Sequence, residues 1–295
     1  MKRPTVAQAW QSGEMTDDAT AATFQSAGVA TATRVNSIMH IRDIGLSPLK
    51  GGRHQPREHL LLEANGPAGD RVFAVVDPES GQILKTVEHP SLLTCTADWH
   101  KGMLSVQTDG HEVTAQPEFT CEYLELDYWG RATSMEIVGG PWADELSRVL
   151  GRSVLLTRSV VRGGVVFGDS VTIVSTSSLA RLARESGINV DTRRFRATFT
   201  IDTGDAVAHV EDSWAGRELE VGGARLLVKG GIPRCAVIDL EPDTGLRGTS
   251  LLKSLAGYRL QANEIMFGVY AEVIRPGAVS MGAEAHVMTP APLLP

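Results

Sequence analysis

Short apolar segments separated by glycine-containing turns run through most of the sequence, and they restrict the possible fold more than any other feature. "RVFAVVD" (71–77) is a compact apolar strand, "PESG" is a turn with proline at its second position, and "QILKTV" (82–87) is the returning strand. "GMLSVQTDGHEVTAQ" (102–116) repeats the hairpin pattern with Asp-Gly at its tip. A chain built from such hairpins is expected to form sheets or barrels.

Helical patterns are few. Three segments combine apolar residues at helical spacing with a capping residue or a final glycine: "PWADELSRVLG" (141–151), "STSSLARLARESGI" (175–188) and "GTSLLKSLAGYRL" (248–260). The segments "RRFRATFTID" (193–202) and "CAVIDL" (235–240) are typical of strands. The pattern predicts a β-rich α+β protein with a β-barrel. The sequence has no GxGxxG between a strand and a helix and no GK[ST] loop, so a nucleotide-binding unit is not expected.

Charge and cysteine content exclude several classes of protein. The 295 residues carry a net charge of −7, which is not the basic excess that neutralises nucleic-acid phosphates. Cys95, Cys121 and Cys235 form no CxxC pair, which is typical of a reducing compartment. No apolar run approaches the roughly 18 to 20 residues that span a bilayer, and the N-terminal segment lacks the apolar core of a signal peptide. We expect a cytoplasmic protein with no nucleic-acid or membrane partner.

Cys235 is the first candidate for chemistry. It lies in "VKGGIPRCAVIDLEPDTG" (228–245), where the glycines allow the backbone and the thiol to approach a bound group closely. A thiolate is a nucleophile, a soft metal ligand and a sulfur carrier, and the adjacent Arg234 is a candidate for binding an anion. The alternative is a buried strand cysteine that acts as a small apolar residue.

Other catalytic patterns lack support. The histidines are scattered without HxH or HExxH spacing, so a histidine metal site is not expected. The serines lie in no GxSxG elbow, which disfavours a serine hydrolase. A pyridoxal-phosphate role for Lys50 has no flanking support.

Several motifs, in order along the chain, resemble one family. "RCAVIDLEPDTG" (234–245) followed by "LLKSLAGYR" (251–259) looks like the signature of the MOSC domain, the module shared with the C-terminus of molybdenum-cofactor sulfurases. "IRDIGLSPLKGG" (41–52) and "GDRVFAVVDPESGQILKT" (69–86) are similar to the MOSC N-terminal β-barrel domain. The layout is similar to the mitochondrial amidoxime-reducing component and to bacterial hydroxylaminopurine-resistance proteins.

The resemblance implies a fold and a domain division. It implies a MOSC-type β-barrel core with an N-terminal β-barrel-like subdomain. We expect a flexible or peripheral arm over 1–33, the N-terminal subdomain over 34–130 and the MOSC domain over 131–295.

The resemblance also implies a site, because the family binds a molybdenum cofactor (Mo-molybdopterin) with a cysteine as ligand to the metal. Carried over by position, Cys235 is this ligand and the catalytic residue. Six further residues are the candidates for cofactor binding: Lys50, Arg71, Ser175, Arg196, Thr198 and Arg234. Cationic side chains suit a pterin phosphate and molybdate oxygens, and the serine opens a helix whose N-terminus favours an anion.

The chain departs from the family pattern at three positions, one of them a candidate residue and two next to candidates. Gly51 stands where the family has a serine, and Ala197 and Thr198 replace a proline and an asparagine. Structural alternatives also stay open, since Arg71 next to Asp70 can be a simple ion pair. In the same way, Arg196 can lie on a solvated strand face, and Lys50 can be an ordinary loop lysine.

Three functions follow from these observations. The first is a molybdenum-dependent oxidoreductase that reduces N-hydroxylated small molecules with electrons from a separate flavin or iron–sulfur protein. The second, which the departures favour somewhat, is a sulfurtransferase in cofactor or natural-product biosynthesis. Its Cys235 would carry a persulfide received from a donor such as a cysteine desulfurase. The third is a cofactor-free binding module.

Overall fold

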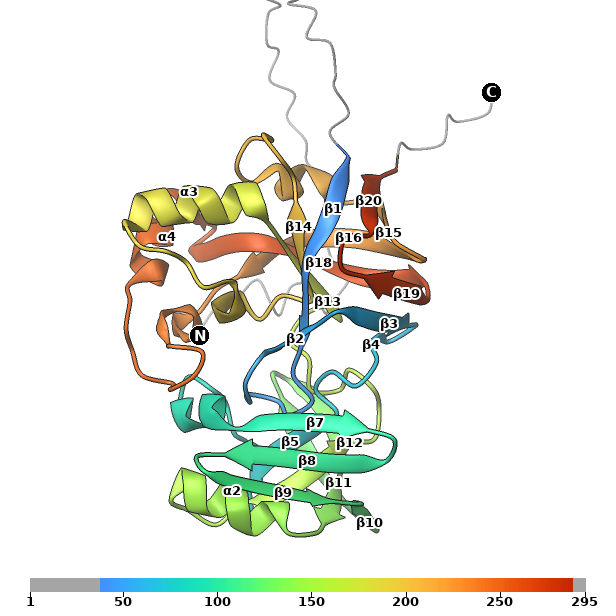
Figure 1. Ribbon diagram of the computed structural model, residues 1–295. Coiled ribbons are helices and arrows are strands. Elements are labelled where there is room, and N and C mark those ends of the chain that lie inside the picture. Colours follow the sequence, from blue (N-terminus) through green and yellow to red (C-terminus); the bar gives the residue numbers. More distant parts are fainter. Residues whose placement is uncertain (1–37, 289–295) are drawn as a thin grey trace, which may run out of the picture. The chain divides into compact units, whose positions relative to one another are not determined.

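Seven strands close into a barrel that combines the first and last strands of the described chain (Figure 1). The computed structural model describes residues 38–288; the arm expected over 1–33 lies outside this range. Around the barrel the strands are β13 (Val171–Ser175), β14 (Phe199–Asp202), β1 (Met39–Leu46), β20 (Glu284–Val287), β15 (Glu218–Val221), β16 (Ala224–Pro233) and β18 (Glu264–Arg275). Antiparallel pairing of β13 with β18 closes the ring.

Alternating burial explains why these segments form barrel strands. In β16 the side chains of Ala224, Leu226 and Val228 are buried in the barrel core, while their neighbours Arg225 and Lys229 are partly exposed. This period of two is the strand pattern. β2 (Gln55–Arg57) and β17 (Leu260–Gln261) extend the sheet by pairing with β1 and β18.

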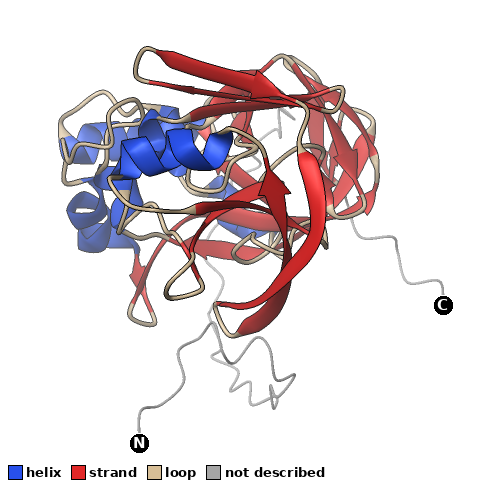
Figure 2. Ribbon diagram, turned by 90° about the horizontal axis from the view of Figure 1, so that it is seen from below, coloured by secondary structure: helices blue, strands red, loops and turns tan. Residues whose placement is uncertain are grey.

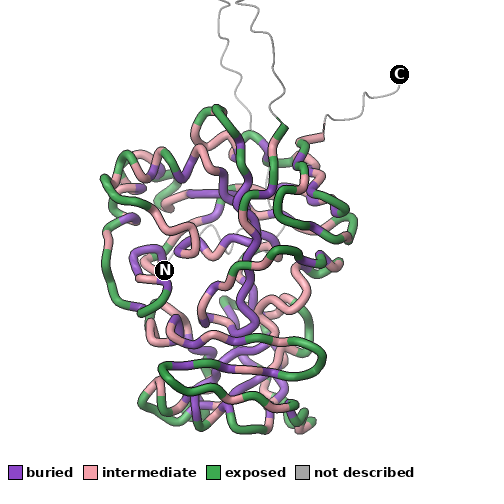
Figure 3. Tube along the Cα trace, in the orientation of Figure 1, coloured by how far each residue is buried: buried purple, intermediate pink, exposed green. Residues whose placement is uncertain are grey.

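A second group of strands comes from the N-terminal half of the chain, with β12 and the late strand β19 added to it. A curled five-stranded sheet has the order β10 (Glu118–Tyr128), β11 (Arg131–Gly139), β12 (Leu155–Ser159), β5 (Phe73–Asp77) and β6 (Gln82–Ile83). A three-stranded sheet has the order β7 (Thr96–His100), β8 (Met103–Thr108) and β9 (His111–Ala115). Another three-stranded sheet has the order β19 (Gly277–Ser280), β3 (His59–Glu63) and β4 (Gly66–Pro67). The tube in Figure 3 shows buried residues running through both parts.

The three expected helices are confirmed as α2 (Trp142–Leu150), α3 (Thr176–Ser186) and α4 (Leu251–Arg259). Helix α3 connects β13 to the parallel strand β14, the connection that a parallel pair requires. Helices α3 and α4 lie together against the barrel, and Figure 2 shows the helices gathered on one side of the strands. Within residues 38–288, no helix has both the length and the apolar character needed to cross a bilayer.

The prediction of a β-rich α+β protein with a barrel core is confirmed, but two of the predicted strands are wrong. Short 3-10 helices are η1 (Pro90–Thr94), η2 (Thr192–Phe195), η3 (Val210–Trp214) and η4 (Ala236–Asp239). "RRFRATFTID" therefore begins as η2 and becomes a strand only at Phe199, and "CAVIDL" forms η4. Buried Arg194 of η2 ties the two turns together, because its guanidinium donates to the carbonyls of Ile238 and Leu240.

Candidate functional site

Cys235 lies at the end of β16, where the chain leaves the barrel. Its neighbour Arg234 still pairs through its backbone N–H with the carbonyl of Ile265, and Cys235 is then the N-cap residue of η4. The thiol is free and the residue is exposed. The alternative of a buried strand cysteine is therefore wrong, and the sulfur is accessible to a ligand.

The segment after Cys235 is fixed by a set of arginines. Besides the two carbonyls of η4, Arg194 pairs with Glu241. In the following turn, Asp243 accepts two hydrogen bonds from the Arg193 guanidinium at 2.9 and 2.8 Å, and its carbonyl accepts from Arg53 at 2.7 Å. The turn over 241–245 is thus tied to both parts of the chain, which holds the cysteine segment in place.

Arg234 points inward along β18. Its Nε donates to the carbonyl of Phe267 at 2.8 Å and its Nη1 to the carbonyl of Phe195 at 3.0 Å, while its Nη2 is buried without a partner among the described residues. Burial lowers the pKa of Arg234 to about 10, so the guanidinium is charged at neutral pH. Its Nη2 amino group is available to an acceptor that the described residues do not supply.

Arg71 and Arg196 both adopt the left-handed backbone conformation, with φ of 46° and 51°. This conformation is uncommon for side chains with a Cβ and is concentrated at functional sites. Arg196 donates from Nη1 to the carbonyl of Gly52 at 2.6 Å, and its Nη2 is a second buried N–H group without a partner in the described chain. Arg71 pairs with Asp70, whose other oxygen accepts from the backbone N–H of Ser47. The ion-pair alternative for Arg71 is therefore present, and the solvated-face alternative for Arg196 is wrong.

Lys50 brings a further positive charge to the same place. Burial, followed by the positive charges of Arg71 and Arg196, lowers the pKa of Lys50 to about 7. Its Nζ lies 4.8 Å from the centre of the Tyr128 ring. The structure thus brings together Lys50, Arg71 and Arg196, which lie far apart in the sequence.

Tyr270 connects this group to Arg234. Burial raises the pKa of Tyr270 to about 12, and the nearby charges of Arg234 and then Arg71 act in the opposite direction. We call Lys50, Arg71, Arg196 and Arg234 the cationic cluster. Asp70 is the carboxylate paired within it, so the cluster carries excess positive charge that favours an anion.

Ser175 and Thr198 are engaged elsewhere. The Ser175 hydroxyl caps α3 by accepting from the N–H of Ser178, and it donates to the buried Glu211 carboxylate at 2.6 Å. The Thr198 hydroxyl accepts from the N–H of Thr172 in β13. Both side chains are buried in contacts within the protein, and their role in cofactor binding stays a prediction.

One departure from the family pattern has a packing reason. Gly51 has a φ of 83°, and a Cβ at this position would lie 2.9 Å from Leu92 Cδ1 and 3.1 Å from Thr86 Oγ1. A serine next to Lys50 would therefore be strained in its backbone and would crowd the side chains of Leu92 and Thr86. Gly51 therefore forms the turn that directly follows Lys50.

His54 is a site neighbour that the sequence did not indicate. Its buried Nε2 contacts the carbonyl of Ala197 at 3.0 Å, next to Arg196. Burial, followed by the charges of Arg196 and Arg71, lowers the pKa of His54 well below its usual value, so the ring is neutral. Gly45 makes room for it, since a Cβ there would lie 2.2 Å from Nε2. The contact with Gly45 forms only in the folded chain, so the sequence alone could not identify His54 as a neighbour of the site.

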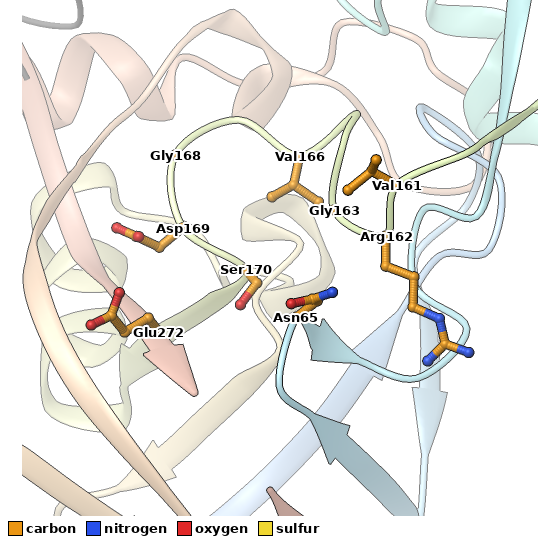
Figure 4. A pocket seen from close by; sticks show the side chains of 9 residues that line it. All are labelled: Asn65, Val161, Arg162, Gly163, Val166, Gly168, Asp169, Ser170 and Glu272. Atoms are coloured by element: carbon orange, nitrogen blue, oxygen red, sulfur yellow. The ribbon is translucent and has the colours of Figure 1, made fainter. Parts of the chain in front are cut away.

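The cavity in Figure 4 is separate from this cluster. It has a volume of about 240 Å³ and lies beside the loop between β12 and β13, with Asp169 and Glu272 on one side and Arg162 pointing away. Burial raises the pKa of Asp169, and the charge of Lys229 acts in the other direction. Its lining includes none of the predicted site residues.

Two family models match the chain in succession. A model of the MOSC N-terminal beta barrel domain matches residues 38–153, and a model of the MOSC domain matches residues 160–286. The models meet between 153 and 160, whereas the boundary expected from the sequence, 130/131, falls in the turn between β10 and β11.

Curated relatives match over a shorter stretch. A molybdenum cofactor sulfurase of Solanum lycopersicum is 36% identical over 84 residues, 28% of this chain and 10% of that protein. One from Drosophila erecta is 30% identical over 117 residues, 40% of this chain and 14% of that protein. The match thus spans about a tenth of the length of the first of these relatives.

Solved structures are similar at low identity. The YUAD protein from Bacillus subtilis is 12% identical with a TM-score of 0.42, over 85% of this chain and 97% of that one. YiiM from Geobacillus stearothermophilus is 15% identical with a TM-score of 0.31, over 41% of this chain and 54% of that one.

Proposed function

We propose that this chain binds a molybdenum cofactor and reduces N-hydroxylated small molecules. The chain belongs to the MOSC family and carries a MOSC N-terminal β-barrel domain before its MOSC domain. The observation that carries the proposal is the cationic cluster. Arg196 and Arg234 each have a buried Nη2 without a partner among the described residues, and Lys50 lies among positive charges.

The residues present fit an anionic pterin cofactor. A buried N–H group without an acceptor is costly, and a phosphate oxygen satisfies it with a charge-assisted hydrogen bond. Arg196 and Lys50 would hold the phosphate, and Arg234 would donate its free Nη2 to a further oxygen. An anion would also relieve the repulsion of Lys50 by Arg71 and Arg196.

Cys235 would hold the metal. Its thiol is exposed at the end of β16, directly after Arg234, and a thiolate is a ligand that soft metal centres prefer. When bound, the molybdenum centre would supply the two-electron transfer of an oxygen atom from nitrogen. Electrons would come from a separate flavin or iron–sulfur protein, which docks on this chain during turnover.

A second function is supported by the exposure of Cys235 and by the similarity of the chain to part of molybdenum cofactor sulfurases. As a sulfurtransferase, the Cys235 thiolate would attack the outer sulfur of a donor persulfide, such as that of a cysteine desulfurase. The sulfur would then sit on Cys235 and the donor thiol would be released. A thiol fixed in place on a tied segment and open to a partner is suited to this exchange.

The expected result for the first function is reduction of N-methylhydroxylamine to methylamine by cofactor-loaded protein with a reduced viologen dye. The Cys235→Ser variant should be slower by more than about a hundredfold, because even outer-shell substitutions at metal sites cost 10 to 100-fold. Equal rates for the two proteins would contradict the proposal. Absence of reduction, together with a mass increase of one sulfur atom on Cys235 after incubation with a loaded desulfurase, would favour sulfur transfer.

A further inference from the structure

Trp129 occupies a turn position that disfavours it. Tyr128 and Arg131 pair at the end of the β10–β11 hairpin, so Trp129 and Gly130 form its two-residue turn, with φ of 55° and 79°. Two positive φ angles define a type I′ turn, in which asparagine, aspartate or glycine is strongly preferred. A large aromatic residue here is strained, and 54% of its surface is exposed. Residues that break a local rule in this way concentrate at functional sites.

A second aromatic residue meets Trp129 from another part of the chain. Phe167 lies in the loop between β12 and β13, and its ring contacts Trp129 edge to face at 5.2 Å. The loop is held there by hydrogen bonds from Arg131 to the carbonyl of Val166 and from Thr133 to the carbonyl of Gly164. The aromatic pair is therefore a fixed feature of two anchored segments.

The pair lies beside the cationic cluster. Tyr128, which precedes Trp129, has the Nζ of Lys50 over its ring. Lys85 places its Nζ 4.8 Å from the centre of the Trp129 ring, and its charge is close enough to Lys50 to lower the pKa of that amine. The aromatic face is thus covered by an ammonium group, whose Nζ also lies 3.9 Å from Glu88 Oε1; an anionic ligand would compete for this charge.

We propose that Trp129 and Phe167 form an aromatic subsite, which takes a flat ring of the ligand whose anionic or polar group binds at the cationic cluster. This inference rests on the proposed function, since it assumes that the cluster binds an anion. Lys85 would leave the Trp129 ring and pair with the anionic group, and the flat ring of the ligand would take its place. Stacking on an exposed indole favours planar ligands over aliphatic ones of equal charge.

The test compares phenyl phosphate with methyl phosphate by titration calorimetry on the full chain. The parent protein is expected to bind phenyl phosphate about tenfold more tightly, the size of effect that one aromatic contact supplies. The Trp129→Asn variant should lose this preference. Asparagine is favoured in a type I′ turn, so the melting temperature of the variant should equal or exceed that of the parent protein. Loss of the subsite can then be distinguished from unfolding.

The control is Tyr123→Asn on the same hairpin, since Tyr123 is also 54% exposed; it should keep the tenfold preference. A preference that survives in Trp129→Asn would overturn the inference while leaving the proposed function intact. If neither phosphate binds, or if Lys50→Met does not weaken methyl phosphate, the cationic cluster is no anion site. The proposed function then fails, and the subsite fails with it.

The ring can belong to the substrate or to the pterin of the cofactor, and a second arm separates these sources. In cofactor-loaded protein, a substrate ring on Trp129 predicts faster reduction of N-phenylhydroxylamine than of N-methylhydroxylamine, lost in Trp129→Asn. A pterin ring on Trp129 predicts instead that this variant retains less cofactor. Either result supports the aromatic subsite. If Trp129→Asn shows neither effect, the inference is overturned.

Discussion

Replacement of Gly268 by alanine is expected to lower the free energy of unfolding by about 3 kcal/mol or more. Gly268 lies in β18 with a φ of 73°, where an alanine is strained. A Cβ there would lie 2.5 Å from the carbonyl oxygen of Ile173 and 2.9 Å from Val174 Cγ1, both in or next to the closing pair of the barrel. Relief of this contact requires the backbone to move, and overpacking in a core typically costs 1 to 3 kcal/mol by itself.

Gly257→Ala is the matched control. Gly257 is exposed in α4, and a Cβ there meets nothing within 4 Å. Alanine at an interior helix position is expected to stabilise the protein by about 0.5 to 1 kcal/mol. Urea denaturation followed by circular dichroism measures both variants. A cost below about 1 kcal/mol for Gly268→Ala would contradict the close packing of β13 against β18.

Lys50→Met is expected to change stability and anion binding in opposite directions. The variant removes a donor to the anion, and a hydrogen bond to a charged group contributes about 1.5 to 3 kcal/mol, so the affinity for phosphate should fall at least about tenfold. Without an anion, the charge of Lys50 is disfavoured by burial and by Arg71 and Arg196. Methionine fills similar space without this charge, so the free energy of unfolding should rise at neutral pH.

The pH dependence of the free energy of unfolding tests whether the Lys50 amine causes this change in stability. The folded-state pKa of Lys50 is about 7, below its usual value of 10.5. Below pH 7 the amine is protonated in both states and the full cost of its charge is present. Between about pH 7 and 10.5 the unfolded state binds more protons, so the free energy of unfolding rises with pH. Lys50→Met should lose this rise, and phosphate affinity of the parent protein should fall as the pH increases through 7.

Lys253→Met provides the comparison for charge alone, because Lys253 is an exposed lysine in α4. It should retain both the pH-dependent rise in stability and the affinity for phosphate. Titrations at pH 6 and pH 9, with chemical denaturation at the same values, measure the two effects. If Lys50→Met is less stable than the parent at pH 6, the protonated amine does not destabilise the folded protein, and this prediction is contradicted.

Local patterns in the sequence predicted the architecture because burial and turn chemistry are local properties. The hairpin of β8 and β9 and the ends of α3 at Ser175 and Gly187 follow directly from the residues. The strand predicted over 235–240 is wrong because a distant side chain, Arg194, binds the carbonyls of that segment and curls it into η4. Tertiary contacts of this kind override a short apolar pattern.

The candidate site was predicted in part, through a resemblance to a family and not through spacing. Lys50, Arg71 and Arg196 lie in three separate loops, and only the folded chain brings their charges together. The buried Nη2 atoms, the left-handed arginines and the neutral His54 depend on backbone geometry that residue types do not encode. Trp129 could be suspected from its position before Gly130, but its neighbour Phe167 could not.

The most direct test of the central claim is the molybdenum content of the purified chain from a host that makes the cofactor. The cationic cluster and Cys235 predict near-stoichiometric molybdenum in the parent protein. They also predict loss of the metal in Cys235→Ser and its retention in Cys121→Ser, a change at another free, exposed cysteine. A parent protein without molybdenum, beside a fully loaded control molybdoenzyme from the same cells, would contradict the claim.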